Sequence, residues 1–478
     1  MKTYYWHDYE TFGIDPQTDR PAQFAGVRTD EDFNIIDDPL VIYCKPSADY
    51  LPNPDACLIT GITPQLALQK GVCEAEFIAQ IHAQIAQPNT CTVGYNNIRF
   101  DDEVTRNCLY RNFYDPYARE WQNGNSRWDL IDVVRAARAL RPDGIVWPFD
   151  ADGVANNRLD QLTIANNIVH EAAHDALSDV IATIALAKLI NTAQPRLFQY
   201  LTSHRVKSKL NELLCVGHFT PSVHVSGMYS TKNNSLAIVV PICQHPTNNN
   251  GVIVYDLSVD PEPLLSLTVE EIKTRIFTAS AELPEGVARI PLKTVHLNKC
   301  PVLAPISVIR PQDAERLQLD LAVCKVNCQT ISAAQDLTKK VAAVFSARDY
   351  AEVPMDPDRA IYSGGFFNDV DKQKFALIRD CASEKLPHLA LNFSEPRLTE
   401  MYFRYKGRNY PDSLNATEQL RWQQFCKQRL MGQNTEGVVP IDAYRAKLTE
   451  LSTQEGTPVA LINALQAYAD SLCAPHTQ

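Results

Sequence analysis

Hydrophobic positions in the first 195 residues follow two different spacings. Runs rich in β-branched and aromatic residues predict strands at residues 3–9, 23–28, 40–44 and 90–95. Apolar residues three and four positions apart predict helices at residues 74–86, 102–112, 130–140 and 174–191. This alternation predicts an α/β domain with a mixed sheet over residues 1–195, and the long last helix, rich in Ala, Ile and Leu, is expected to pack across the sheet.

The pattern changes after Pro195. Short β-branched runs are separated by clusters of Asn, Gly and Pro, and they predict strands at residues 222–225, 235–240, 251–257 and 294–297. Strands at these spacings predict a small antiparallel barrel, assigned to a domain of residues 196–350. Helical periodicity starts at Pro311 and continues, past an irregular stretch near residues 353–365, to the C-terminus. The last domain, residues 351–478, is therefore predicted to be all-helical.

Composition narrows the class of protein. Hydrophobic residues make up 45% of the chain and charged residues 21%, which is ordinary for a soluble globular protein. No apolar run approaches membrane-spanning length, and the start of the chain lacks the order of a signal peptide, so we expect a cytoplasmic protein without a membrane partner. The 13 scattered cysteines include no C-x-x-C pair, which argues against a disulfide framework or a zinc cluster. A net charge of −11 disfavours a broad polyanion-binding surface but allows a local one.

Candidate chemistry begins with two acids near the N-terminus. Asp8 and Glu10 lie two positions apart on a predicted strand, so their side chains point to the same face. Like charges held side by side repel each other unless a cation lies between them, and a divalent metal ion is the usual solution. The alternative is that both acids face water beside a turn, which is the commoner meaning of an isolated Asp-x-Glu.

Three further residues could join this pair. Asp101 stands where a predicted strand leads into a helix, whereas its neighbours Asp102 and Glu103 are explained by helix capping. Asp179 lies among small and apolar residues and therefore needs a partner. His174, five positions earlier, reaches the same site only if it lies in the first turn of the helix or before it; a histidine bonded to nearby backbone is the alternative.

The order of these residues resembles the DEDD exonuclease superfamily, in the branch with a histidine before the last Asp. The segments HDYETFG, GYNNIRFDDEVTRN, NSRWDLIDV, HVSGM and NKCPVL also resemble the bacterial exonuclease I family throughout the chain. The resemblance implies a ribonuclease H-like domain, an SH3-like barrel and a helical C-terminal domain. It further implies degradation of single-stranded DNA from the 3′ end to nucleoside 5′-monophosphates, in DNA repair and recombination.

The resemblance also assigns roles. Two Mg²⁺ ions, for which Mn²⁺ can substitute, would be held by four acids: Asp8 bridges both ions, Glu10 and Asp179 bind the ion that activates water, and Asp101 binds the other. His174 would act as general base. The expected substrate-binding residues are Glu10, Thr11, Phe12, Asn97, Arg99 and Arg158, with Thr11 and Phe12 positioning the terminal nucleotide by backbone contact and stacking.

Two binding surfaces are expected outside the catalytic residues. Rings and cations interleave at residues 402–410, which suits either stacking on single-stranded DNA or a helix with buried aromatic residues. The family resemblance implies that the acidic C-terminal tail of single-stranded DNA-binding protein is a partner, bound by Arg141, Tyr200 and Arg310. Pro305 departs from the family there, because relatives can carry a polar residue at that position. The resemblance also favours a monomer.

Two other functions remain open from the sequence. An exoribonuclease could use the same catalytic residues, since the four acids do not distinguish the sugar. A non-catalytic nucleic-acid-binding scaffold could keep the fold. The complete set of acids argues against the scaffold.

Overall fold

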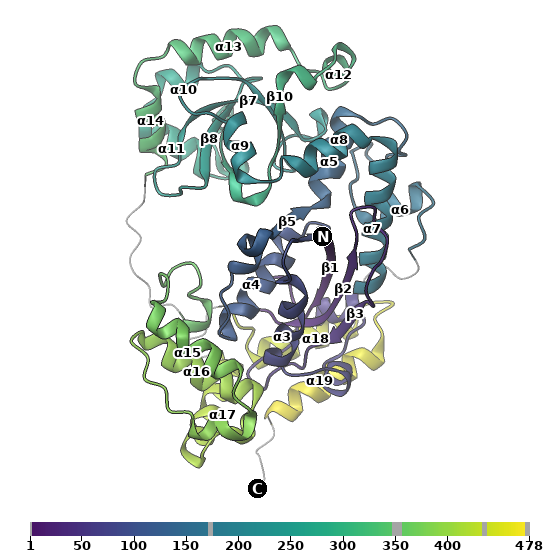
Figure 1. Ribbon diagram of the computed structural model, residues 1–478, viewed down its shortest axis with the longest axis vertical. Helices are drawn as coiled ribbons and strands as arrows, with labels where there is room; N and C mark the ends of the chain where they lie inside the picture. Colours follow the sequence, from purple (N-terminus) through teal and green to yellow (C-terminus); the bar gives the residue numbers. More distant parts are fainter. Residues whose placement is uncertain (1, 171–174, 347–355, 433–436, 474–478) are drawn as a thin grey trace. The chain divides into compact units, whose positions relative to one another are not determined.

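A computed structural model describes residues 2–170, 175–346, 356–432 and 437–473. The chain forms two compact units, each assembled from segments that are far apart in the sequence (Figure 1). Unit 1 contains Met1–Arg127, His170–Thr183 and Val353–Gln478. Unit 2 contains Trp128–Val169 and Ile184–Glu352. Each unit is described by itself below. His174, the predicted general base, lies outside the described residues.

The first sheet has the predicted mixed topology. Its strands are β1 (Thr3–Thr11), β2 (Pro21–Thr29), β3 (Leu40–Tyr43), β4 (Thr90–Gly94) and β5 (Ser126–Asp129), in the order β3-β2-β1-β4-β5. The central strand β1 runs antiparallel to β2 and parallel to β4. Its pairing with β2 shifts register between Glu10 and Thr11, so the strand bends immediately after its second acid.

Helices from both ends of the sequence complete unit 1. The N-terminal ones are α1 (Pro54–Thr60), α2 (Pro64–Lys70), α3 (Glu74–Ile85) and α4 (Asp101–Arg111). The C-terminal ones are α15 (Asp369–Arg379), α16 (Pro396–Asn409), α17 (Ala416–Leu430), α18 (Ile441–Ser452) and α19 (Val459–Cys473). One apolar cluster joins β1 and β2 to α3 and α4, and a second joins α1 and α2 to α17, α18 and α19. The C-terminal helices therefore share a core with the sheet-bearing segment.

Unit 2 contains the predicted antiparallel sheet. Its strands are β6 (Ser222–Val225), β7 (Leu236–Gln244), β8 (Gly251–Asp256), β9 (Leu292–His296) and β10 (Val302–Pro305), in the order β10-β6-β7-β8-β9, with every neighbouring pair antiparallel. The helices are α5 (Leu130–Leu140), α6 (Leu159–Ala165), α8 (Pro195–Ser203), α9 (Lys207–Leu213), α10 (Glu262–Ser266), α11 (Val269–Phe277), α12 (Pro311–Arg316), α13 (Leu321–Ala333) and α14 (Leu337–Val344). Helical segments that start at Pro311 thus belong with the barrel strands as far as α14.

Helix α7 (Ala176–Ala193) corresponds to the long helix predicted near residues 174–191. Of the helices in the described residues, α7 alone is long and apolar enough, by length and composition only, to cross a membrane. This differs from the expectation that no apolar run approaches that length. Core helices of soluble proteins meet the same criterion. Asp179 in its first turn supplies a carboxylate to the site described next.

Candidate metal centre

Three of the predicted acids meet in unit 1. Asp8 and Glu10 come from β1 and Asp179 from the first turn of α7, and one carboxylate oxygen of each lies within 4.8 Å of the others. Asp101 opens α4 beside the same strand, where its Oδ1 accepts a hydrogen bond of 3.0 Å from the backbone N–H of Tyr9. The fold thus brings together four acids that are spread over 172 positions of sequence, from Asp8 to Asp179.

Burial and mutual repulsion dominate the electrostatics of Asp8 and Glu10. Burial, followed by the charges of Asp101 and Glu10, raises the pKa of Asp8 well above its usual value. Burial and the charges of Asp179 and Asp101 raise the pKa of Glu10 to about 8. A divalent cation fits a cluster of carboxylate oxygens of this kind, because its charge would offset the repulsion among them.

Asp102, next to Asp101, has a structural task. Its side chain is fully buried, with Oδ1 2.8 Å from Arg119 and Oδ2 3.0 Å from Arg127. Glu103 binds Arg106 at 2.8 Å and accepts a hydrogen bond from Tyr362. Both acids lie in the first turn of α4, as predicted, but arginines rather than helix amides occupy their carboxylates. Asp101 is thereby left as the acid of this turn that joins the cluster.

A histidine that the sequence analysis did not select lies at the site. Nε2 of His170 is 2.5 Å from Oδ1 of Asp179, and the His170 ring is almost fully buried. Asp175, also not selected, caps α7 by accepting a hydrogen bond from the Ser178 N–H at 3.1 Å, and its charge contributes to the raised pKa values of Asp8 and Glu10. The sequence signal for His170 was its place in the same short segment as His174, but no helical spacing relates it to Asp179.

Comparisons with known proteins agree along the whole chain. Family models match in three stretches: "Exonuclease" over residues 5–187, "Exonuclease I SH3-like domain" over residues 205–347 and "Exonuclease I C-terminal domain" over residues 355–472. Exodeoxyribonuclease I of Escherichia coli (strain K12) is 46% identical over 475 residues, which cover 99% of this chain and 98% of that protein. The chain belongs to the exonuclease I family. Exodeoxyribonuclease I of Haemophilus influenzae is 44% identical over 471 residues, with 98% of each chain covered.

Solved structures of the exonuclease I family match the fold closely. A moderately thermophilic exonuclease I from Methylocaldum szegediense gives a TM-score of 0.95 at 47% identity, covering 99% of this chain and 100% of that one. E. coli exonuclease I in complex with a dA16 oligonucleotide gives 0.94 at 46% identity with the same coverage. A zinc-bound form of the E. coli enzyme with single-stranded DNA gives 0.93 at 46% identity, and an SSB/exonuclease I structure with the inhibitor CFAM gives 0.89 at 45% identity; each again covers 99% of this chain and 100% of the other.

Phe12, predicted to contact the terminal nucleotide, lies in the interior of unit 1. The Phe12 ring is fully buried in the core that includes α17, α18 and α19, so it cannot stack on a base. Its backbone N–H donates to the Arg20 carbonyl at 2.8 Å, and its carbonyl accepts from the Asn53 N–H at 2.7 Å. Thr11 is half-buried and donates its hydroxyl to the Gly13 carbonyl at 2.6 Å.

The other residues predicted to contact substrate differ in their exposure to solvent. Asn97 is fully buried, and neither polar atom of its amide has a hydrogen-bond partner within the described residues. Arg99 is exposed at the end of the single turn before α4. Arg158 is exposed in unit 2, where it forms an ion pair of 3.1 Å with Asp160.

The segment 402–410 is core rather than a stacking surface. Tyr402, Phe403 and Tyr405 are buried in α16, and the neighbouring cations Arg404 and Lys406 are also buried and paired. Lys406, for example, lies 2.6 Å from Glu418. Of the two possibilities that the sequence left open, the helix with buried aromatic residues is the one observed.

An aromatic surface does exist elsewhere in unit 1. A cavity of about 220 Å³ is lined by rings that include Tyr117 and Phe366 and by the cations Lys372 and Arg379. Phe366 is 88% exposed, and its ring centroid lies 6.3 Å from that of Tyr117. The sequence analysis missed this feature because Phe366 follows the stretch that was interpreted only as irregular.

The three residues predicted to bind a partner lie in unit 2. Arg141 and Arg310 share the buried carboxylate of Asp313, at 3.3 and 2.8 Å. The Tyr200 hydroxyl donates to the Leu303 carbonyl at 3.0 Å. A cavity of about 300 Å³ in the same unit is lined mainly by apolar atoms and includes Ile306, four positions before Arg310.

Proposed function

We propose that this member of the exonuclease I family removes nucleotides from the 3′ end of single-stranded DNA and releases nucleoside 5′-monophosphates. The observation that carries the proposal is the convergence of Asp8, Glu10 and Asp179 within 4.8 Å, with Asp101 bonded to the same strand. The exposed ring of Phe366 and the half-buried ring of Tyr117, beside two cations, support binding of unpaired bases, because rings stack on any base and cations follow phosphates.

We propose Mg²⁺ as the cofactor, with Mn²⁺ able to substitute. Asp8, Glu10, Asp179 and Asp101 would hold the ions, which when bound activate water and stabilise the charge on the leaving oxygen. The chain's own groups hold the site in place: β1 aligns two acids on one face, Tyr9 orients Asp101, and His170 contacts Asp179. His174 is proposed to accept the proton of the attacking water.

A product assay on a 5′-labelled single strand, with and without Mg²⁺, tests this function. Asp8→Asn and Asp179→Asn should each abolish release of mononucleotides, because each removes a negatively charged ligand at the site, while binding of the oligonucleotide stays measurable. The exposed Asp38 provides a matched control, and Asp38→Asn should keep the original rate. Full release by either Asp8→Asn or Asp179→Asn, or faster loss of a matched RNA strand, would overturn the proposal.

We further propose that the acidic C-terminal tail of single-stranded DNA-binding protein binds unit 2. Arg141 and Arg310 supply cations, and the apolar cavity at Ile306 can accept a hydrophobic end. Arg310→Ala should weaken binding of a labelled tail peptide by about tenfold in fluorescence anisotropy, since one charge pair is lost. Lys339→Ala, which removes an exposed cation paired with Asp336, should leave the affinity unchanged.

A further inference from the structure

The end of the metal-binding strand is held by the C-terminal helices. Phe12 comes directly after β1, two positions beyond Glu10, and its ring is fully buried. The apolar cluster around it contains Leu430 of α17, Ile441, Tyr444 and Leu448 of α18, and Leu465 of α19. Phe12, the residue that follows β1, is thus packed into a core. Much of that core comes from residues more than 400 positions later in the chain.

A short segment before α1 holds the backbone of the same residue. The Phe12 carbonyl accepts hydrogen bonds from the Asn53 N–H at 2.7 Å and from the Tyr50 hydroxyl at 2.9 Å. The Tyr50 hydroxyl also lies 2.8 Å from Oδ1 of Asp19, in the loop between β1 and β2. The position of the strand end therefore depends on where residues 50–53 are fixed.

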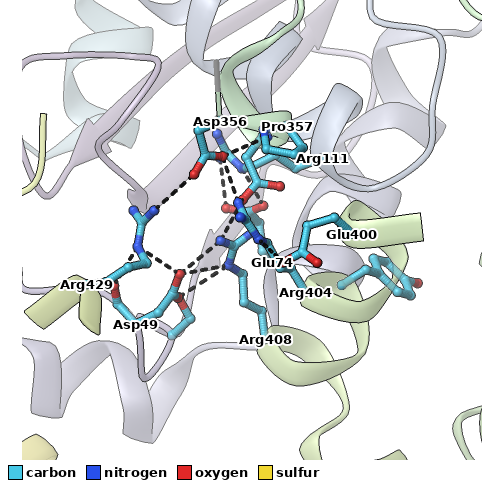
Figure 2. Close-up of polar contacts among 12 residues, drawn as sticks. Asp49, Glu74, Arg111, Asp356, Pro357, Glu400, Arg404, Arg408 and Arg429 are labelled. Atoms are coloured by element: carbon cyan, nitrogen blue, oxygen red, sulfur yellow. Dashed lines mark hydrogen bonds and ion pairs between the residues drawn. The ribbon is translucent and has the colours of Figure 1, made fainter. Parts of the chain in front are cut away.

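Asp49 fixes that segment to the C-terminal helices. Its carboxylate is fully buried and binds Arg408 of α16 at 2.9 and 3.1 Å and Arg429 of α17 at 3.4 Å (Figure 2). Burial alone would raise the pKa of Asp49, but the charges of Arg408, Arg429 and Arg20 lower it below its usual value. Ionised Asp49 thus connects α16 and α17 to Tyr50, its neighbour in sequence, and the Tyr50 hydroxyl bonds the Phe12 carbonyl.

We propose that Asp49, Arg408 and Arg429 are positioning residues for the metal site, acting through Tyr50 and Phe12 on the carboxylate of Glu10. The inference rests on the proposed metal-dependent function. The fold holds the carboxylate of Glu10 close to those of Asp8 and Asp179, although like charges repel each other. The end of β1 must therefore be held rigidly. The ion pairs supply that rigidity from a part of the chain that contributes no ligand among the described residues.

Binding of Mn²⁺ to the full-length protein, followed by electron paramagnetic resonance of the free ion, tests the proposal without relying on activity. Arg408→Met should weaken Mn²⁺ binding by about tenfold, the range seen when a partner of a metal ligand is lost, and Arg408→Lys should restore part of it. Tyr50→Phe removes only the hydroxyl and should weaken Mn²⁺ binding in the same direction. The double variant should lose less than the product of the single losses, because both act along one path.

Lys406→Met provides the matched control. Lys406 lies two positions from Arg408 on α16 and is equally buried, but it pairs with Glu418 at 2.6 Å rather than with Asp49. The Lys406→Met variant should have a lower melting temperature than the wild type and an unchanged Mn²⁺ affinity.

The outcomes separate this inference from the proposed function. Wild-type Mn²⁺ affinity in folded Arg408→Met and Tyr50→Phe would overturn the positioning role alone. If Arg408→Met does not fold, Tyr50→Phe decides, since it keeps the packing of the ring. A wild-type protein that binds no Mn²⁺ would overturn both proposals.

Discussion

At the scale of single residues, His170 carries a consequence for the reaction. Its ring nitrogen lies 2.5 Å from one oxygen of Asp179 and so orients a carboxylate that we propose as a metal ligand. His170→Ala should lower metal-dependent nucleotide release by about 10- to 100-fold, and His170→Asn, which can still donate a hydrogen bond, should recover part of the loss. Binding of single-stranded DNA in EDTA should not change. An unchanged rate in His170→Ala would show that the contact has no part in catalysis.

Glu10 makes stability and metal binding depend on pH in opposite directions. Its pKa in the metal-free folded protein is about 8, against an ordinary value of 4.5, so between these values the folded state holds a proton that the unfolded state has released. The free energy of unfolding contributed by Glu10 therefore falls as pH rises from about 4.5 to 8. Metal binding displaces the same proton, so Mn²⁺ affinity should rise over that range.

Thermal unfolding in EDTA between pH 5.5 and 8.5 measures the first effect. The fall in melting temperature with pH should be smaller in Glu10→Gln than in the wild type, because the substituted side chain does not titrate. The same slope in both proteins would contradict the assignment of this pH dependence to Glu10.

At the scale of elements, the first turn of α4 separates two adjacent acids by function. Asp102→Asn removes the fully buried charge that pairs with both Arg119 and Arg127 and should lower the free energy of unfolding by about 3–5 kcal/mol in urea denaturation. Asp101→Asn should abolish nucleotide release without this loss, because Asp101 adds to the repulsion on Asp8. Equal stability of the two variants would contradict the division.

At the scale of the whole molecule, the first and last parts of the chain form one unit. Removing residues 353–478 would delete most of the apolar partners of Phe12 and take away Arg408 and Arg429, the cations that pair with Asp49. We expect the truncated chain to lose the cooperative unfolding of unit 1, as measured by circular dichroism and limited proteolysis, while unit 2 keeps a folded transition. A truncated chain that unfolds cooperatively and still releases nucleotides would show that the N-terminal segment is self-sufficient.

Local pattern was enough to predict much of this protein. The spacing of apolar residues predicted the mixed sheet and the antiparallel strands, because the period of apolar positions within a short window distinguishes a helix from a strand. The order of Asp8, Glu10, Asp101 and Asp179 selected acids that the structure brings together, since a strand aligns alternate side chains and a motif retains its order along the chain.

Long-range packing decided the rest. Phe12 and Asn97 follow or precede catalytic acids in sequence, yet tertiary contacts bury both. His170 reaches Asp179 only through the path of the chain before α7, and Asp102 meets its arginines 17 and 25 positions away. Sequence spacing specifies which side chains share a face, but burial and charge pairing depend on which distant segment covers that face. The sequence thus determined many of the elements and the acids that converge, and only the tertiary structure decided which of their neighbours are buried and which side chains pair with them.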